Sequence, residues 1–394
     1  MKPIVIAGSG LAGYTVAREF RQLDSSTPLL IITGDDGSFY SKPMLSNAFA
    51  QNKPITTLLS RSAEQMAAQL NATILTNTRI QQIAATRRSL LTSAGEFEFE
   101  QLVLAVGAKP VQLTMQGDAA DQILSVNHWQ DYAELRKRLD TAGSGAHVVI
   151  LGAGLIGCEF ADDFSGAGYR VTLVDPNTLP LAALAPPPVS RRLQQALLAK
   201  QVRIQAGTTA THLTHAGTSL QVALTNGQSL TADLVLSAIG LRPDLRLAES
   251  AGLATGRGIR VSVFGETSIP GIYALGDCTE YAQPDGAHLW LPYVAPVMAA
   301  ARTIAQNLSG HSRRIEFKPM PVLVKTPSCP IALMPVAPDL AKRGRWETDE
   351  EGGITISRFY DHQDKLRGFG LAPQDQQQRN ALLQELGSSC HLIA

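Results

Sequence analysis

Two copies of the spacing G-x-G-x-x-G constrain the fold of this chain more than any other feature. They occupy residues 8–13 (GSGLAG) and 152–157 (GAGLIG), and each follows a short apolar run of β type and precedes apolar residues at helical spacing. In such a strand–turn–helix unit the first glycine permits the turn, the second lets the backbone approach a pyrophosphate, and the third lets helix and strand pack closely. One copy would be weak evidence, but two copies in this context predict two dinucleotide sites.

Composition limits the classes of protein to which the chain can belong. Its 394 residues, 44% hydrophobic and 17% charged, indicate an ordinary globular protein of two or three domains. Because 34 basic residues balance 34 acidic ones, no net field attracts nucleic acid or an anionic membrane. No apolar run reaches the length of a membrane span, and no signal peptide precedes the first strand. We therefore expect a cytoplasmic protein that binds no nucleic acid and does not insert into membranes.

The cysteines exclude two kinds of redox chemistry. Cys158, Cys278, Cys329 and Cys390 form no C-x-x-C or similarly close pair, so a dithiol that reduces disulfides is not expected. None lies in the N-terminal third, where flavin enzymes that reduce peroxide or dioxygen through a cysteine carry it. Cys158 fits a small helix residue, Cys278 a packing residue after a strand and Cys390 a tail residue, whereas the role of Cys329 stays open. No metal site is predicted.

A carboxylate is expected at the end of the second strand of each dinucleotide unit, roughly 20 residues beyond the glycines, where it accepts hydrogen bonds from the adenosine ribose. In the first unit either Asp35 or Asp36 fills this position after the strand at residues 29–32, although Asp-Asp-Gly is also a good turn sequence. In the second unit the acid is Asp175. No Arg or Lys lies between Asp175 and Ser190 to bind a 2′-phosphate, so NADH is predicted over NADPH.

A second repeated feature indicates an internal, diverged duplication. Residues 102–110 and 234–243 each read as a buried strand that ends in a small-x-Gly turn and a proline. Further on, residues 267–277 form an alternating strand ending in Gly276-Asp277, which places a carboxylate at the strand edge where ligands of open α/β sheets bind. Residues 292–308 follow as a helix whose N-terminus is expected to face a ligand.

The order of these motifs resembles the two-dinucleotide-binding flavoproteins over almost the whole chain. Within that family, residues 40–46 (YSKPMLS), 151–160 (LGAGLIGCEF) and 324–330 (VKTPSCP) are similar to the bacterial rubredoxin reductases. Those enzymes pass electrons from NADH through bound FAD to a rubredoxin that serves alkane hydroxylation. The resemblance implies the same cofactors, reaction and pathway here.

The expected fold class is α/β, with two Rossmann-like domains and a small C-terminal α+β domain. We assign residues 1–110 and 240–315 to a discontinuous FAD-binding domain, 111–239 to the NAD-binding domain and 316–394 to the C-terminal domain. The residues predicted at the FAD are Gly8, Gly10, Leu11, Ala12, Gly13, Asp35, Asp36, Lys42, Pro43, Ala105, Gly107, Gly276, Asp277, Val294 and Lys325. Those predicted at the NAD are Gly152, Gly154, Leu155, Ile156, Glu159, Asp175 and Gly240.

No catalytic side chain is required beyond the flavin, because the protein supplies positioning and electrostatics. The resemblance implies that Lys42 lies beside the isoalloxazine, Glu159 near the nicotinamide, and Lys325 toward the flavin from the C-terminal domain. One departure matters: many ferredoxin-reducing relatives carry a lysine where this chain has Asn47. We interpret Lys325 as taking over the electrostatic task of that lysine.

Rubredoxin is a small acidic iron protein, so its docking face on a neutral reductase must be a local basic patch. Lys42, Arg302, Lys318 and Lys325 are the candidates. A ferredoxin, or a flavorubredoxin that detoxifies nitric oxide, is the alternative acceptor, because the motifs concern cofactors and the acceptor is chosen by surface shape. An NADH-sensing binding protein is the alternative from another class. The flavin potential and the oligomeric state stay open.

Overall fold

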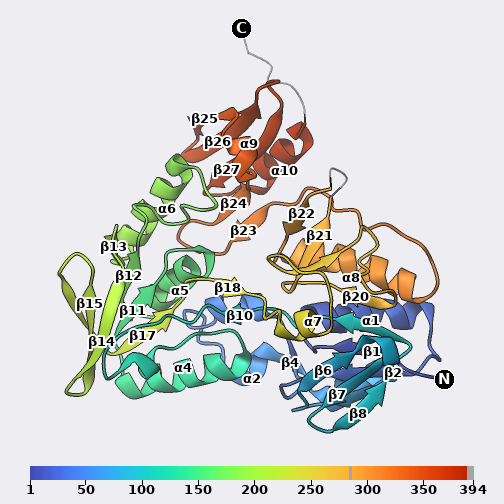
Figure 1. The fold of residues 1–394 in the computed structure, drawn as a ribbon. Coiled ribbons are helices and arrows are strands. Elements are labelled where there is room, and N and C mark those ends of the chain that lie inside the picture. The colour runs from blue at the N-terminus through green and yellow to red at the C-terminus, as the bar shows by residue number, and fades with distance from the viewer. Residues whose placement is uncertain (284–285, 388–394) are drawn as a thin grey trace. The chain divides into compact units, whose positions relative to one another are not determined.

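The computed structural model describes residues 1–283 and 286–387, which form two compact units (Figure 1). The first unit comprises Met1–Lys42, Ile55–Lys109 and Leu241–Lys318. The second comprises Pro43–Pro54, Pro110–Gly240 and the chain from Pro319 onward. Residues 43–54, predicted with the FAD-binding domain, thus pack within the second unit. The predicted domain limits stay a prediction.

The first unit is built on a parallel five-stranded sheet in the order β20-β9-β1-β2-β5. All residues of the central strands β1 and β2 are buried, as is typical of a parallel sheet covered on both faces. Helices α1 and α8 pack against each other. The elements are β1 (Ile4–Ala7), α1 (Leu11–Leu23), β2 (Leu29–Ile32), β5 (Thr73–Leu75), β9 (Gln101–Leu104), β20 (Ile272–Ala274) and α8 (Val294–Leu308).

Smaller elements complete the first unit. An antiparallel sheet β6-β7-β8 and a mixed sheet β19-β21-β22 are its main additions. The bounds are β3 (Phe39–Tyr40), α2 (Ile55–Leu58), β4 (Leu59–Arg61), α3 (Ala63–Leu70), β6 (Ile80–Ala84), β7 (Ser89–Thr92), β8 (Gly95–Glu98), β10 (Lys109–Pro110), β18 (Leu241–Arg242), α7 (Arg246–Ser250), β19 (Ile259–Val261), β21 (Thr279–Ala282) and β22 (His288–Trp290).

The second unit repeats the central arrangement in a parallel four-stranded sheet in the order β13-β12-β11-β17. Strand β11 pairs with β12 and β17 just as β1 pairs with β2 and β9, which agrees with the duplication predicted from the sequence. The elements are the 3-10 helix η1 (Lys42–Asn47), α4 (Trp129–Ala142), β11 (His147–Leu151), α5 (Leu155–Gly166), β12 (Arg170–Asp175), α6 (Pro187–Ala199), β13 (Arg203–Ala206), β14 (Ala210–Ala216), β15 (Ser219–Leu224), β16 (Ser229–Ala232) and β17 (Leu234–Ser237).

The C-terminal part of the second unit is an antiparallel five-stranded sheet in the order β23-β24-β27-β26-β25, with two helices. A Cβ on Gly370 would lie 3.0 Å from atoms of Pro186 and Val189, so this glycine lets α6 pack closely on the sheet. The elements are β23 (Val322–Val324), β24 (Ile331–Met334), α9 (Pro338–Ala341), β25 (Gly344–Glu351), β26 (Ile354–Asp361), β27 (Leu366–Ala372) and α10 (Gln376–Glu385). The predicted fold class, two Rossmann-like domains and a small α+β domain, is confirmed.

Candidate functional site

The first glycine turn, between β1 and α1, is shaped by its outer two glycines. Gly8 has φ +113°, and a Cβ on it would lie 2.3 Å from the carbonyl oxygen of Ala105. A Cβ on Gly13 would lie 2.0 Å from the oxygen of Gly8. In contrast, a Cβ on Gly10 would meet no heavy atom within 4 Å among the described residues. The fold itself therefore requires the first and third glycines, and the second one lies open.

The second turn, between β11 and α5, has the same geometry. Gly152 has φ +103°, and a Cβ on Gly157 would lie 2.0 Å from its oxygen. A Cβ on Gly154 would again meet nothing within 4 Å in the described part of the chain. In both turns the open glycine is the N-cap residue of the helix and supplies no capping side chain, so helix N–H groups remain for an anion. The residues present fit a pyrophosphate at each turn.

The predicted ribose-binding acids also hold the turns in shape. Asp35 Oδ1 accepts hydrogen bonds from Ser9 Oγ at 2.9 Å and Gly37 N at 3.0 Å, and Asp175 Oδ2 accepts one from Ala153 N at 2.6 Å. Ser9 and Ala153 stand at the same place, between the first two glycines of each turn. Each acid therefore ties its glycine turn to the end of the second strand. The sequence indicated a turn role for Asp35 or Asp36 but not the link of either acid to its glycine turn, and the ribose contact stays a prediction.

Residues predicted at the FAD meet at the carboxyl ends of β9 and β20. Gly276 has φ +85°, and a Cβ on it would lie 3.1 Å from Cβ of Ala12 in the first turn of α1. Its neighbour Asp277 is partly buried, and this burial raises the pKa of the carboxyl group, whereas the positive charge of Lys42 acts in the opposite direction. Val294 is the first residue of α8. The structure thus joins Gly8, Ala12, Ala105, Gly276 and Asp277 in one region of the first unit.

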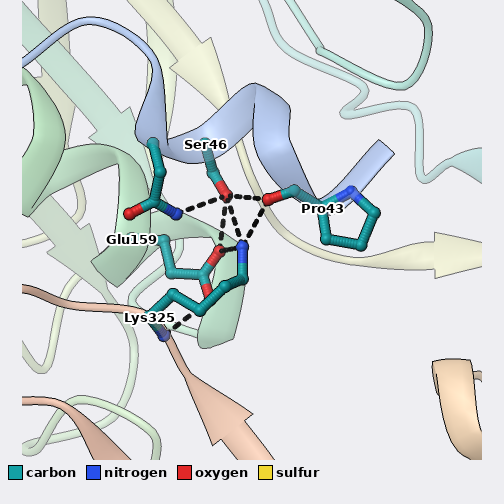
Figure 2. A network of polar contacts seen from close by, with 5 residues as sticks. Pro43, Ser46, Glu159 and Lys325 are labelled. Atoms are coloured by element: carbon teal, nitrogen blue, oxygen red, sulfur yellow. Dashed lines mark hydrogen bonds and ion pairs between the residues drawn. The ribbon is translucent and has the colours of Figure 1, made fainter. Parts of the chain in front are cut away.

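A polar network in the second unit joins Glu159, on α5, to two segments far from it in the sequence (Figure 2). The fully buried carboxylate of Glu159 accepts a hydrogen bond from Ser46 Oγ at 2.5 Å and forms an ion pair with Lys325 Nζ at 3.0 Å. Its other oxygen accepts the Lys325 backbone N–H at 2.9 Å. The Lys325 ammonium also donates to the carbonyl oxygen of Pro43 and lies 3.4 Å from Ser46 Oγ. Glu159 and Lys325, predicted near nicotinamide and flavin, are therefore direct partners.

Two further buried acids on α5 extend this attachment. Asp162 accepts the backbone N–H of Ser328 at 3.0 Å. Asp163 accepts those of Phe49 and Ala50, both at 2.9 Å. Burial raises the pKa of Asp163, and the N–H donors oppose this shift. The helix whose N-terminus forms the second glycine turn thus also fixes residues 43–50 and 325–328.

Sequence reasoning missed Asp162 and Asp163. A signal was present, because residues 159–163 (EFADD) place three acids in one and a half turns of a helix whose other positions are apolar or small. Acids in a helix without a polar face are expected to have buried partners.

The predicted basic patch stays a prediction. Arg302 forms an ion pair with Glu19 at 3.4 Å, and Lys325 pairs with Glu159. The side chains of Lys42 and Lys318 are exposed. Two of the four candidates therefore have an acidic partner within the same unit.

Three cysteines are free, buried thiols: Cys158, Cys278 and Cys329. Burial raises the pKa of all three, to about 11 for Cys329, so the neutral thiol prevails at physiological pH. Cys390 lies outside the described residues.

Within residues 1–283 and 286–387 no group of three or more His, Cys, Asp or Glu side chains is arranged to hold a metal ion. No helix in these residues is both long and apolar enough to cross a bilayer.

Comparison with known families agrees with this geometry. The family described as pyridine nucleotide-disulphide oxidoreductase matches residues 2–302, which include both glycine turns. The chain belongs to the pyridine nucleotide-disulphide oxidoreductase family. A second family, described as rubredoxin binding C-terminal domain, matches residues 314–386. The predicted cofactors, FAD and NADH, are those of the oxidoreductase family.

Named relatives match nearly the whole chain. A rubredoxin-NAD(+) reductase of Alcanivorax borkumensis is 39% identical over 98% of this chain and 99% of its own length. One of Acinetobacter baylyi is 42% identical over 94% of each chain. A nitric oxide reductase FlRd-NAD(+) reductase of Vibrio vulnificus is 33% identical over 98% of each chain.

Solved structures show the same fold. The ferredoxin reductase for the CYP199A2 system of Rhodopseudomonas palustris superposes with a TM-score of 0.88 at 25% identity, covering 99% of this chain and 96% of its own.

Proposed function

We propose that this chain is an NADH-dependent flavoprotein that passes electrons from NADH to a rubredoxin. The observation that carries the proposal is the match of residues 314–386 to a rubredoxin-binding domain, on a chain whose residues 2–302 match the oxidoreductase family. The reductases of Alcanivorax and Acinetobacter, similar over nearly their whole length, support the same acceptor. The cytoplasmic location and the link to alkane hydroxylation stay predictions.

The chain's own residues bind and orient two dinucleotides. The open backbone at Gly10 would receive the pyrophosphate of FAD, and that at Gly154 the pyrophosphate of NADH. The Asp175 carboxylate would accept hydrogen bonds from the ribose hydroxyls of NADH and repel the 2′-phosphate of NADPH. Bound FAD would supply the chemistry that couples a two-electron hydride donor to a one-electron carrier.

Glu159 and Lys325 have a positioning role in this proposal. Glu159 lies one turn inside the helix that would hold the NADH pyrophosphate, and it fixes both the main chain and the ammonium of Lys325. The two contacts hold the Lys325 side chain in one orientation and so fix the position of its ammonium. A cation fixed in a partly dry site stabilises nearby negative charge more strongly than one in water. The Glu159 carboxylate offsets part of this positive charge, and we assign to the remainder the stabilisation of negative charge on the reduced cofactor.

A flavorubredoxin is the second acceptor to consider, because relatives named for nitric oxide reduction are 33–36% identical to this chain. The test compares three acceptors in NADH-driven assays: a rubredoxin, the rubredoxin domain of a flavorubredoxin, and a plant-type ferredoxin. The proposal expects the highest kcat/KM with rubredoxin and the lowest with ferredoxin. A preference for ferredoxin would refute the proposed acceptor while leaving the cofactor sites intact.

A further inference from the structure

An exposed arginine stacks on a tryptophan in the first unit. The guanidinium carbon of Arg257 lies 4.0 Å from the ring centroid of Trp290. Trp290 ends β22, and Arg257 stands two residues before β19, in the same three-stranded sheet. The Arg257 backbone N–H donates to Glu280 Oε1 on the middle strand at 2.9 Å, so the arginine is held in place at its main chain as well as at its tip.

This pair is attached to segments predicted to contact FAD. The indole Nε1–H of Trp290 donates to the carbonyl oxygen of Asp277 at 2.7 Å. Tyr293 is the N-cap residue of α8; burial raises its pKa, and the positive charge of Arg257 acts against that rise. Val294, the next residue, is 49% exposed. The stacked pair therefore lies beside Asp277 and the start of α8, both of which the sequence analysis placed at the cofactor.

Among the described residues, the Arg257 guanidinium forms no ion pair with an acid, unlike two neighbouring arginines. Arg260 in the same sheet forms an ion pair with Glu280 at 3.7 Å, and Arg302 on α8 pairs with Glu19 at 3.4 Å. Within the part of the chain that the structure describes, no carboxylate lies within 4.0 Å of the Arg257 guanidinium. A cation–π contact orients the guanidinium but leaves its charge in place.

We propose that Arg257 and Trp290 form a docking surface for the rubredoxin on the first unit, in addition to residues 314–386, which match a rubredoxin-binding domain. The inference rests on the proposed function, because it takes the acceptor from there. The iron of a rubredoxin is held by four cysteine thiolates, which give its centre a net negative charge, so a fixed cation beside an apolar side chain complements it. Arginine and tryptophan are also the side chains most often found at the energetic centre of protein interfaces. The proposed surface differs from the predicted patch of Lys42, Arg302, Lys318 and Lys325.

The test compares Arg257→Gln with a matched control, Arg87→Gln. Arg87 is an exposed arginine of the same unit, in the connection between β6 and β7. Figure 1 shows strands β6 and β7 on the opposite side of that unit from β21 and β22. Calorimetric titration of the holoenzyme with oxidised rubredoxin at low ionic strength gives Kd for each. We expect Arg257→Gln to weaken binding about tenfold and to flatten its salt dependence, and Arg87→Gln to bind like the original protein. Reduction of a neutral quinone by NADH should be unchanged in both variants.

Two results would overturn the docking surface, and they are distinguishable. If the unaltered protein binds rubredoxin and Arg257→Gln binds equally well, the surface is wrong and the proposed function stands. If the unaltered protein reduces the quinone but does not bind rubredoxin, the proposed acceptor fails together with the surface.

Discussion

Replacing Glu159 by glutamine removes the negative charge from the buried network while nearly preserving the shape of the side chain. One carboxylate oxygen accepts the Lys325 backbone N–H, and the other accepts Ser46 Oγ–H and the Lys325 ammonium. An amide has a single oxygen, so its NH₂ group must face a donor in either orientation. The Glu159→Gln variant therefore loses one charge-assisted hydrogen bond.

The size of the effect follows from the exposure of the partner. Loss of a hydrogen bond to a charged group costs about 1.5–3 kcal/mol. The Lys325 side chain is 37% exposed, so its ammonium regains water, and we expect about 2 kcal/mol, in the lower part of that range. The loss acts on the local opening of residues 43–47 and 325–328, since these segments are attached through Glu159. An opening made easier by this amount accelerates amide exchange about 30-fold.

Hydrogen–deuterium exchange of peptides covering these two segments measures the effect. Glu134→Gln is the matched control, because it makes the same chemical change in the same unit, where Glu134 pairs with Arg138 at 2.8 Å on the exposed surface of α4. Exposed pairs of this kind contribute roughly 0.3–0.5 kcal/mol. Equal exchange of residues 325–328 in both variants and the original protein would refute the account of the network.

The remaining predictions concern the second glycine turn, Asp163 and Lys325. Gly157→Ala should destabilise the second unit, because its Cβ would lie 2.0 Å from a backbone oxygen. Gly154→Ala should fold normally but raise KM for NADH, because its Cβ would stand where the pyrophosphate approaches. Melting curves and NADH titrations that fail to separate the two variants would contradict the assigned roles. Burial raises the pKa of Asp163 in the folded state, so its contribution to stability is complete below the ordinary pKa of an aspartate and is lost as pH rises through the folded value. As the pH rises from the ordinary aspartate pKa through the raised pKa of Asp163, the melting temperature should therefore fall more steeply for the original protein than for Asp163→Asn. Parallel curves of melting temperature against pH would contradict the raised pKa. Lys325→Met should slow flavin reduction by NADH and lower the flavin potential; an unchanged rate and potential would dispose of its electrostatic role.

Features that depend on neighbouring residues were predictable from the sequence. Each glycine turn is a local strand–turn–helix unit, so spacing alone located both turns, and the acids at the ends of β2 and β12 followed from the same template. The sequence did not show that Asp175 also accepts Ala153 N–H, because a spacing rule does not say which donors a carboxylate meets in the folded chain.

Contacts across long sequence separations could not be derived from spacing. Ser46, Glu159 and Lys325 meet only because the fold brings three separate segments together. The resemblance to known reductases placed Glu159 and Lys325 near the cofactors but gave no contact between them. The partners of surface charges could not be predicted from the sequence either. It does not show that Arg302 pairs with an acid or that Arg257 stacks on an aromatic ring.

Rubredoxin reduction in a single turnover tests the central claim most directly. The holoprotein is reduced with NADH under anaerobic conditions and then mixed in a stopped-flow instrument with oxidised rubredoxin or, in parallel, with a plant-type ferredoxin. The account predicts fast bleaching of rubredoxin and slow reduction of ferredoxin. Fast reduction of ferredoxin with slow bleaching of rubredoxin would contradict it, and reduction of neither would favour an NADH-sensing protein.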